Sequence, residues 1–194
     1  MNTLPDMLRA SSWAPTLNAD EFARIEAETI TRNCAAGSLI CRKGEPVENW
    51  IGVVTGLVKM ANVSADGKPT SFTGMGTGGW FGEGSLLKDE PRRYDIVALR
   101  ASQIAYMPRA TFMRLLDSNM AFNRFLLIQL NERLGQFIAM VEHDRLLGPD
   151  ARLARCLAGL LIRICIRASA PRCPYRRKNS ASSRGCRASA STRR

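Results

Sequence analysis

Between residues 34 and 107 the chain consists of short apolar runs separated by glycines, a pattern that suits strands rather than long helices. The runs occupy residues 38–41, 50–54, 57–63, 70–74, 95–99 and 103–107. Asp66 and Gly67 stand between two of them, and an Asp-Gly pair in that position favours a tight β-hairpin. Closely spaced strands without intervening helices predict antiparallel sheets, and a jelly roll fits this pattern best.

A helical pattern precedes the strands. Leu17, Phe22 and Ile25 recur at helical spacing in and beside residues 18–30. The segment opens at Asn18, which is followed by Ala, Asp and Glu, and such a start can cap a helix N-terminus. We therefore expect a short leading helix.

After Pro108 the periodicity becomes helical again. Residues 109–116 predict one short helix, and Asp117-Ser118-Asn119 can cap a second one that runs from about residue 120 to 147. Gly148 and Pro149 are expected to end it. Its apolar residues recur at steps of three and four and form one stripe: Phe122, Phe125, Leu126, Leu130, Leu134, Phe137, Ile138 and Val141.

The length of this second helix predicts a partner. At 1.5 Å per residue it spans roughly 40 Å, more than a small roll needs to cover its own open face. We interpret the stripe as a parallel contact with the same helix of a second subunit, which makes the chain a homodimer. The alternative is a helix folded against its own domain.

Charge is distributed unevenly along the 194 residues. The net charge is +11, yet residues 162–194 hold ten Lys or Arg and no Asp or Glu, so the remaining 18 basic and 17 acidic residues leave a body of about +1. The chain has no apolar run of membrane-spanning length and no secretory signal at its start. A cytoplasmic protein without membrane contact is therefore expected.

Neither a metal site nor a catalytic residue is predicted. None of the six cysteines forms a C-x-x-C pair, and buried or idle thiols are expected. His143 is the only histidine, and no nucleophile or carboxylate is implied beside it, so we interpret it as a solvated residue rather than a base. The chain is not expected to be an enzyme. Its three tryptophans are interpreted as packing residues: Trp13, Trp50 and Trp80.

Four motifs carry a family resemblance. They are AGSLI at residues 36–40, KGEP at 43–46, VTGLVK at 54–59 and WFGEGSLL at 80–87. Their order and spacing resemble the Crp/Fnr (catabolite-activator-like) transcription regulators, over about residues 18–161. This resemblance implies mainly β structure with helices, in which a cyclic-nucleotide-binding-like jelly roll precedes a long dimerisation helix. It also implies ligand sensing by the roll and DNA binding by a helix-turn-helix. The domains would be a sensor roll at 1–117, the dimerisation helix at 118–148 and a remnant first helix of the DNA-binding domain at 149–161.

The resemblance also implies a ligand site. In the family, the Gly-Glu-Gly turn offers backbone N–H groups to a phosphate, Glu83 would hold a ribose hydroxyl, and Arg92 would neutralise the phosphate. Here Arg93 and Tyr94 replace two small residues, which leaves little room for a nucleotide. We expect a different small anionic effector, or none, with a cyclic nucleotide as the alternative. The candidate ligand-binding residues are Gly82, Glu83, Gly84, Ser85, Arg92 and Arg93.

Residues 162–194 do not show the pattern of the expected DNA-binding domain. Moving the reading frame back by one base permits the string ISQEELGILAGVSR from the codons of residues 175–187, which resembles a helix-turn-helix. We interpret the tail as a frameshift product that is disordered in this chain, which makes DNA binding by the chain doubtful; a genuine basic tail is the alternative. A stand-alone ligand-binding or dimerisation module, and nonspecific nucleic-acid binding through the tail, remain alternative functions.

Overall fold

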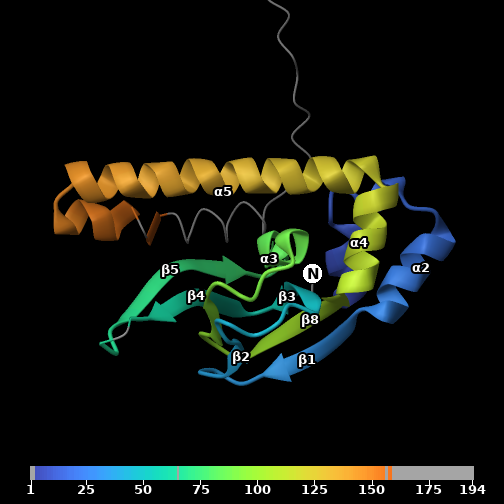
Figure 1. Cartoon of the computed structure of the whole chain (residues 1–194), viewed down its shortest axis with the longest axis horizontal. Helices are drawn as coiled ribbons and strands as arrows, with labels where there is room; N and C mark the ends of the chain where they lie inside the picture. The colour runs from blue at the N-terminus through green and yellow to red at the C-terminus, as the bar shows by residue number, and fades with distance from the viewer. Residues whose placement is uncertain (1–2, 65, 156, 159–194) are drawn as a thin grey trace, which may run out of the picture.

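A β-roll of two sheets lies beneath one long helix (Figure 1). The computed structural model describes residues 3–64, 66–155 and 157–158 of the 194. The helices are α1 (Leu4–Arg9), η1 (Ala14–Thr16), α2 (Ala19–Glu28), α3 (Glu83–Lys88), α4 (Arg109–Ser118) and α5 (Met120–Leu146). The strands are β1 (Ile30–Cys34), β2 (Leu39–Cys41), β3 (Asn49–Thr55), β4 (Leu57–Val63), β5 (Pro69–Gly76), β6 (Trp80–Phe81), β7 (Asp95–Ala98) and β8 (Ser102–Pro108).

The strands form two antiparallel sheets, ordered β1-β8-β3-β6 and β2-β7-β4-β5. The predicted antiparallel roll followed by a long helix is confirmed, and each predicted apolar run contributes a strand. The β4–β5 hairpin also forms as predicted, with Gly67 in the left-handed region at φ 79°. Strands β1 and β6 were not predicted, because β1 is polar and largely exposed and β6 has only two residues.

Side-chain caps define the starts of two of the predicted helices, α2 and α5. The side chain of Asn18 accepts a hydrogen bond from the Glu21 N–H at 2.8 Å, and Glu21 accepts one from the Asn18 N–H at 3.0 Å. This reciprocal pair is a capping box, and it starts α2. The side chain of Asn119 accepts from the Phe122 N–H at 2.8 Å and starts α5. Helix α1 was not predicted from the sequence.

The core has two parts. One lies between the two sheets, and the other lies between the β1-β8-β3-β6 sheet and the helices. In the second part Trp50 stacks on Trp80, with ring centroids 4.3 Å apart. The rings of Phe112 from α4 and Phe122 from α5 meet Trp50 edge-on at 5.3 and 5.5 Å, an arrangement that aromatic quadrupoles favour. Trp13 is fully buried as well, so the three tryptophans are packing residues as predicted.

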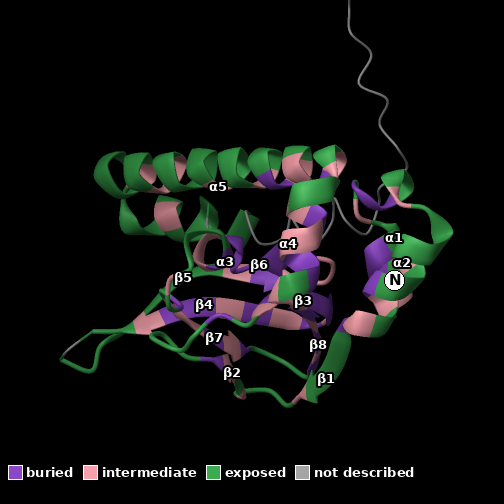
Figure 2. Ribbon diagram, turned by 45° about the vertical axis from the view of Figure 1, so that its right-hand side comes forward, coloured by how far each residue is buried: buried purple, intermediate pink, exposed green. Residues whose placement is uncertain are grey.

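Helix α5 is buried only near its start, and most of its length is exposed (Figure 2). After Leu146 the chain turns, and residues 149–155 form a helical segment that folds back beneath α5 (Figure 1). An ion pair of 3.5 Å between Arg152 and Asp144 joins the two. The predicted remnant helix at 149–161 is thus described only in part, and the tail at 162–194, with the frameshift hypothesis, lies outside the described residues.

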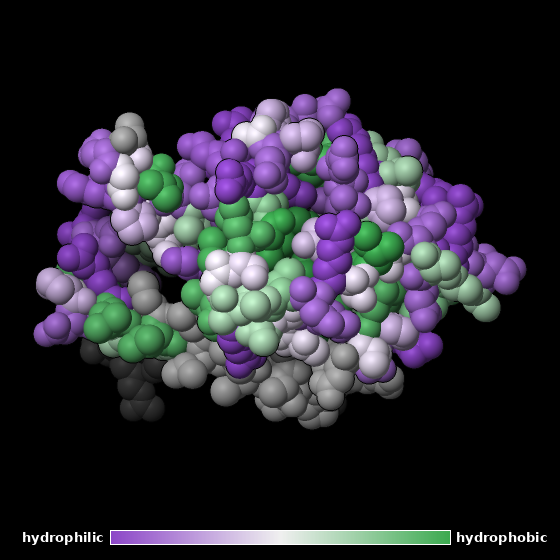
Figure 3. Space-filling model, turned by 90° about the horizontal axis from the view of Figure 1, so that it is seen from below, coloured by the Kyte–Doolittle hydropathy of each residue, from purple (hydrophilic) through white to green (hydrophobic). Residues whose placement is uncertain are grey.

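The surface of the roll is mainly hydrophilic on the side away from α5. Viewed from below, that face has an apolar area in its middle, bordered by hydrophilic side chains (Figure 3). Within the described part of the chain, none of the helices has the length and apolar character needed to cross a membrane.

Gly56, between β3 and β4, should not tolerate a side chain. Its φ is +117°, and a Cβ there would lie 2.1 Å from Ser102 Oγ and 2.7 Å from Ser102 Cα. Gly56→Ala is expected to lower the free energy of unfolding by about 1 to 3 kcal/mol through backbone strain and by a similar amount through overpacking. Gly37→Ala, at φ +82° with open space around it, should show only the strain. Urea denaturation of both variants tests this, and equal losses would contradict the steric clash.

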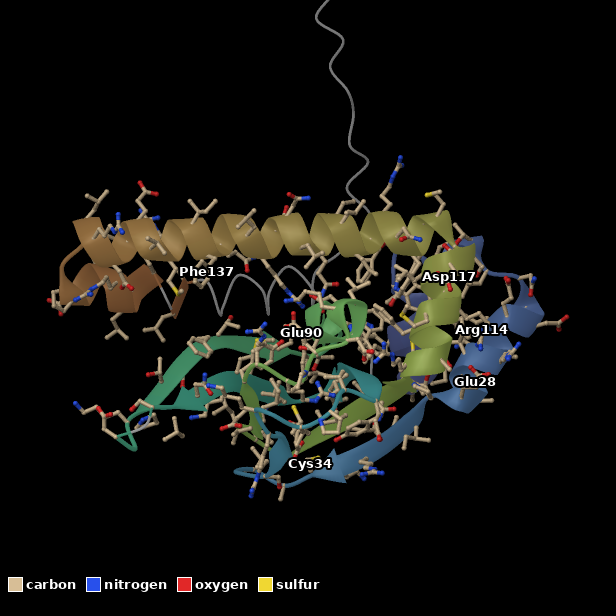
Figure 4. All side chains as sticks on the ribbon, viewed as in Figure 1. Glu28, Cys34, Glu90, Arg114, Asp117 and Phe137 are labelled. Carbon is tan, nitrogen blue, oxygen red and sulfur yellow. The ribbon has the colours of Figure 1, made fainter. Side chains whose placement is uncertain are left out.

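Glu28 joins α2 to α4. Its carboxylate accepts hydrogen bonds from Arg114, at 2.6 Å, and from Thr111, at 2.5 Å, and it also pairs with Arg24 (Figure 4). Hydrogen bonds from Arg114 and then Thr111 lower the pKa of Glu28 from 4.5 to about 2, against the opposing effect of burial. Because the folded-state pKa lies below the unfolded value, this carboxylate stabilises the fold above about pH 4.5, and the contribution is lost as the pH falls toward about 2.

We therefore expect Glu28→Gln to lower the free energy of unfolding at pH 7, with a difference from the parent that shrinks as the pH falls below about 4.5. Glu26→Gln serves as the control, because Glu26 lies on the same helix and makes no hydrogen bond or ion pair within the described ranges. Chemical denaturation at several pH values measures both variants. A difference for Glu28→Gln that stays constant with pH would show that the carboxylate charge is not what stabilises the α2–α4 contact.

Candidate functional site

The turn between β6 and α3 requires a glycine. Gly82 has φ +91°, in the left-handed region, and directly precedes α3. A Cβ at Gly82 would lie 3.2 Å from Arg92 Nη1, so the missing side chain also makes room for that guanidinium. The turn therefore brings Gly82 and Arg92 together, as the sequence predicted.

Arg92 is a buried cation that has no counter-ion within the part of the chain that the structure describes. It is 7% exposed, and its Nη2 donates to the Asn49 carbonyl oxygen at 3.1 Å. Among the described residues no carboxylate forms an ion pair with it. A buried charge of this kind is costly unless an anion compensates it. The position is suited to an anionic ligand.

Glu83, the next residue along the turn, is paired with the long helix. It is 2% exposed, and its Oε1 forms an ion pair with Nη1 of Arg133 from α5. Nη2 of Arg133 also donates to the Trp80 carbonyl oxygen at 2.5 Å, and Nε2 of Gln129 donates to the same oxygen at 2.8 Å. Two side chains of α5 are thus fastened to the segment that leads into α3.

Tyr94 lies close to these charged groups. Burial, and after it the Glu83 carboxylate, raise the pKa of Tyr94 to about 12, while Arg133 and Arg92 act in the opposite direction. Burial likewise raises the pKa of the Cys41 thiol to about 11, against the nearby Arg92 charge. We call the group formed by Gly82, Glu83, Arg92, Tyr94, Gln129 and Arg133 the α3-turn site.

The other predicted ligand residues lie at its edge or outside it. No heavy atom lies within 4 Å of the place where a Cβ of Gly84 would be, so there is open space beside it. Ser85 donates from its hydroxyl to the Pro91 carbonyl oxygen at 3.4 Å. Arg93 does not join the site, because its exposed side chain turns to Glu90, with Nε 2.9 Å from the carboxylate. Of the two bulky replacements, Tyr94 is the one whose buried hydroxyl is subject to the charges of Glu83 and Arg92.

Sequence reasoning did not find Gln129 and Arg133. Together with Phe122 and Leu126 they follow one side of α5, at steps of four, three and four residues. The apolar members pack into the core of the helices and the polar members reach the Trp80 carbonyl. The change from apolar to polar residues along a single helical stripe is the signal that could have identified them.

The predicted dimer stripe divides into two sets. The structure buries Phe122 and Leu126 in the core of their own domain, and Phe125 packs partly against that core, so these three leave the predicted interface. They belong to the stripe that attaches α5 to the roll. The remaining predicted residues are exposed: Leu130, Leu134, Phe137, Ile138 and Val141. Leu127, which was not predicted, is exposed as well.

A cleft of about 520 Å³ lies elsewhere on the surface. Its lining includes Pro46, Pro91 and Pro108 together with Arg109, which forms an exposed ion pair with Asp89. None of the buried side-chain atoms without a hydrogen-bond partner belongs to its lining residues, within the part of the chain that the structure describes. We therefore place the candidate site at the α3 turn rather than in this cleft.

Known proteins share both the sequence pattern and the fold of the roll. Residues 31–119 match the family of the cyclic nucleotide-binding domain. The roll therefore has the fold of that domain. A cAMP-dependent protein kinase regulatory subunit of Debaryomyces hansenii is 31% identical over 111 residues, which are 57% of this chain and 24% of that protein. A cyclic nucleotide-gated potassium channel of Mesorhizobium japonicum is 33% identical over 88 residues, 45% of this chain and 23% of the channel.

Solved structures of transcription regulators have the same fold. The sensor domain of the regulator DNR from Pseudomonas aeruginosa superimposes with a TM-score of 0.60 at 22% identity, covering 69% of this chain and 90% of that one. The catabolite activator protein of Thermus thermophilus superimposes at 0.57 and 23% identity, covering 72% and 62%. The chain spans about a quarter of the length of the two curated relatives.

Proposed function

We propose that this chain is the sensing and dimerising part of a Crp/Fnr-type transcription regulator, in which the roll binds a small anionic effector and α5 joins two subunits. The observation that carries the proposal is the buried guanidinium of Arg92, which has no carboxylate partner in the described ranges and lies against Gly82. A stably folded domain retains a buried, unpaired guanidinium where a bound anion compensates its charge. The kinship with regulator sensor domains supports the same interpretation.

The expected effector is smaller than a cyclic nucleotide. Arg92 supplies the positive charge, and the open space beside Gly84 leaves room at the start of α3. Tyr94 contributes a large ring in the neighbourhood of Glu83 and Arg92. At the packing density of a protein interior, that ring competes with a nucleobase for volume. A small phosphorylated or carboxylated molecule suits the α3-turn site better.

Effector binding would act on the position of α5 through contacts between that helix and the α3-turn site. The Glu83–Arg133 ion pair and the two hydrogen bonds to the Trp80 carbonyl fasten α5 beside the proposed anion position. A ligand that favours one arrangement of these groups over another shifts the position of α5 by population shift. The dimer helix is in this way the element that would respond to the effector.

The dimer itself would form along the exposed stripe of α5. Its apolar residues follow the alternating steps of three and four that left-handed helix pairs require: Leu127, Leu130, Leu134, Phe137 and Val141. An exposed apolar row of this kind on a helix that extends past its own core indicates an interaction surface. Covering it with the same row of a second copy gives a closed two-fold contact.

The proposal that the intact protein recognises DNA is supported only by the similarity in fold to transcription regulators. Residues 149–155 follow α5 at the place in the sequence where we expect the DNA-binding domain of an intact regulator to begin. The segment that would read DNA lies outside the described residues. The alternative, nonspecific nucleic-acid binding, is supported by the ten basic residues and absent acidic residues of positions 162–194.

The effector proposal predicts unequal roles for two adjacent arginines. Ribose 5-phosphate is a suitable probe, because it is a small organic phosphate without a nucleobase. Isothermal titration calorimetry should show that Arg92→Gln lowers its affinity by at least about tenfold, since a charge-assisted hydrogen bond is worth about 1.5 to 3 kcal/mol. Arg93→Gln, which removes an exposed guanidinium bound to Glu90, should leave the affinity unchanged.

Equal losses for the two variants would mean that net charge, rather than the α3-turn site, attracts the phosphate. Cyclic AMP serves as the comparison ligand. If it binds the parent chain as tightly as ribose 5-phosphate and loses affinity in Arg92→Gln, then Tyr94 leaves space for a base and the effector is a cyclic nucleotide.

The dimer proposal predicts a monomer for Phe137→Asp. The side chain of Phe137 is 58% exposed within one chain and lies on the exposed stripe, so Asp there would be buried without a partner at the subunit contact. Ile128→Asp is the matched control, because Ile128 is 57% exposed on the same helix and lies off that stripe. Sedimentation equilibrium should give a dimer for the parent and the control. A monomeric parent, or a dimeric Phe137→Asp, would contradict the proposal.

A further inference from the structure

The cleft of about 520 Å³ lies where three segments of the chain meet, and none of the residues of the α3-turn site lines it. The segments are residues 46–48 between β2 and β3, residues 89–91 after α3, and residues 108–110 at the start of α4. Each contributes one proline, and Val47 and Ala110 add to the apolar lining. The volume is in the range of clefts that bind ligands. The cleft is therefore a largely apolar groove with room for an occupant.

Backbone hydrogen bonds and an ion pair hold the three segments together. The N–H of Arg109 donates to the carbonyl oxygen of Glu48 at 2.7 Å. The N–H of Arg92 donates to the carbonyl oxygen of Glu45 at 2.9 Å, and the side chain of Arg109 forms an ion pair with Asp89. Because each proline also has a fixed φ, the walls have little freedom to change shape. The cleft is thus formed before any partner binds.

The lining of the cleft is negatively charged, although residues 1–161 as a whole carry only about +1. Among the described lining residues, Glu48, Asp89 and Glu90 provide three carboxylates against the cation of Arg109. The carboxylate of Glu90, just after α3, already pairs with two neighbouring cations (Figure 4). Glu48 forms no ion pair within the described chain, and the side chain of Asp89 remains 77% exposed. Two carboxylates can therefore accept hydrogen bonds from a cationic partner.

An apolar groove with accessible carboxylates suits a basic side chain that has apolar neighbours. The aliphatic part of an arginine can lie on the proline rings while its guanidinium donates two parallel hydrogen bonds to a carboxylate. Lysine offers the same charge without this paired geometry. Nucleic acids and other polyanions do not suit the groove, because their charge would meet carboxylates.

We propose that the cleft docks a basic segment of a partner protein, with an arginine of that segment bound to Glu48 and Asp89 and its apolar neighbours packed on the three prolines. A contact of this size is that of a transient complex. Docking there does not require an effector at Arg92. It also leaves α5 free, because no described residue of that helix lines the cleft.

The experiment uses the pentapeptide Pro-Leu-Arg-Leu-Pro with blocked ends, and as a control the same peptide with citrulline, the uncharged isostere of arginine. In NMR spectra of the ¹⁵N-labelled full chain, the arginine peptide should shift the amide signals of the three lining segments. The citrulline peptide should bind about fivefold more weakly, the effect of one exposed ion pair. Glu48→Gln should weaken the arginine peptide by a similar factor. Glu26→Gln, which changes an exposed carboxylate of α2 that forms no ion pair in the described ranges, should leave its affinity unchanged.

Asp89→Asn provides a second variant, because asparagine also tolerates the left-handed backbone found there at φ 54°. It too should weaken the arginine peptide. Equal binding of the two peptides, signal shifts outside the lining segments, or no binding to the parent chain would overturn the proposal. If the parent binds neither peptide while Glu48→Gln shifts the signals of residues 162–194, the occupant is the basic tail of this chain, and docking of a partner protein is overturned.

Discussion

Trp80 holds the α3-turn site in place through two different interactions. Its ring stacks on Trp50 in the core beneath the helices, and its carbonyl oxygen accepts hydrogen bonds from Gln129 and Arg133 of α5. The stack is apolar and closely packed, so the backbone that leads into Gly82 has little freedom to move. A strand of two residues is in this way fixed between the core and α5, and it holds the turn that precedes α3.

The charges of the site are arranged asymmetrically. Glu83 is compensated by Arg133, whereas Arg92 has only the Asn49 carbonyl as a hydrogen-bond partner in the described chain. The anion and the cation of the turn therefore have different partners: Glu83 is paired with Arg133 of α5, and Arg92 is the cation at which we propose that the effector binds. Because Arg92 is only 7% exposed, an anion bound to it would interact more strongly than it would in water.

The apolar residues of helix α5 form two rows, one buried against the core and one exposed. Phe122 and Leu126 attach its first turns to the core, while the row that includes Leu130 and Phe137 stays exposed. In the sequence these residues form one continuous stripe, since three- and four-residue steps describe both rows equally well. Only the packing of α4 and the roll against the start of α5 decides where one row ends and the other begins. This is why the predicted interface contained Phe122 and Leu126, which the structure buries in the core of their own domain.

The local patterns of the sequence were sufficient for the strands of the roll, the β4–β5 hairpin, the cap at Asn119 and the length of α5, because each depends on neighbouring residues. Local patterns do not distinguish the two adjacent arginines, and it was the family resemblance that assigned the phosphate to Arg92. The structure buries Arg92 and pairs Arg93 with Glu90 at the surface. The contribution of Gln129 depends on a contact across 49 residues with the Trp80 carbonyl. Tertiary structure decided these points, because burial and long-range hydrogen bonds arise only when separate elements pack together.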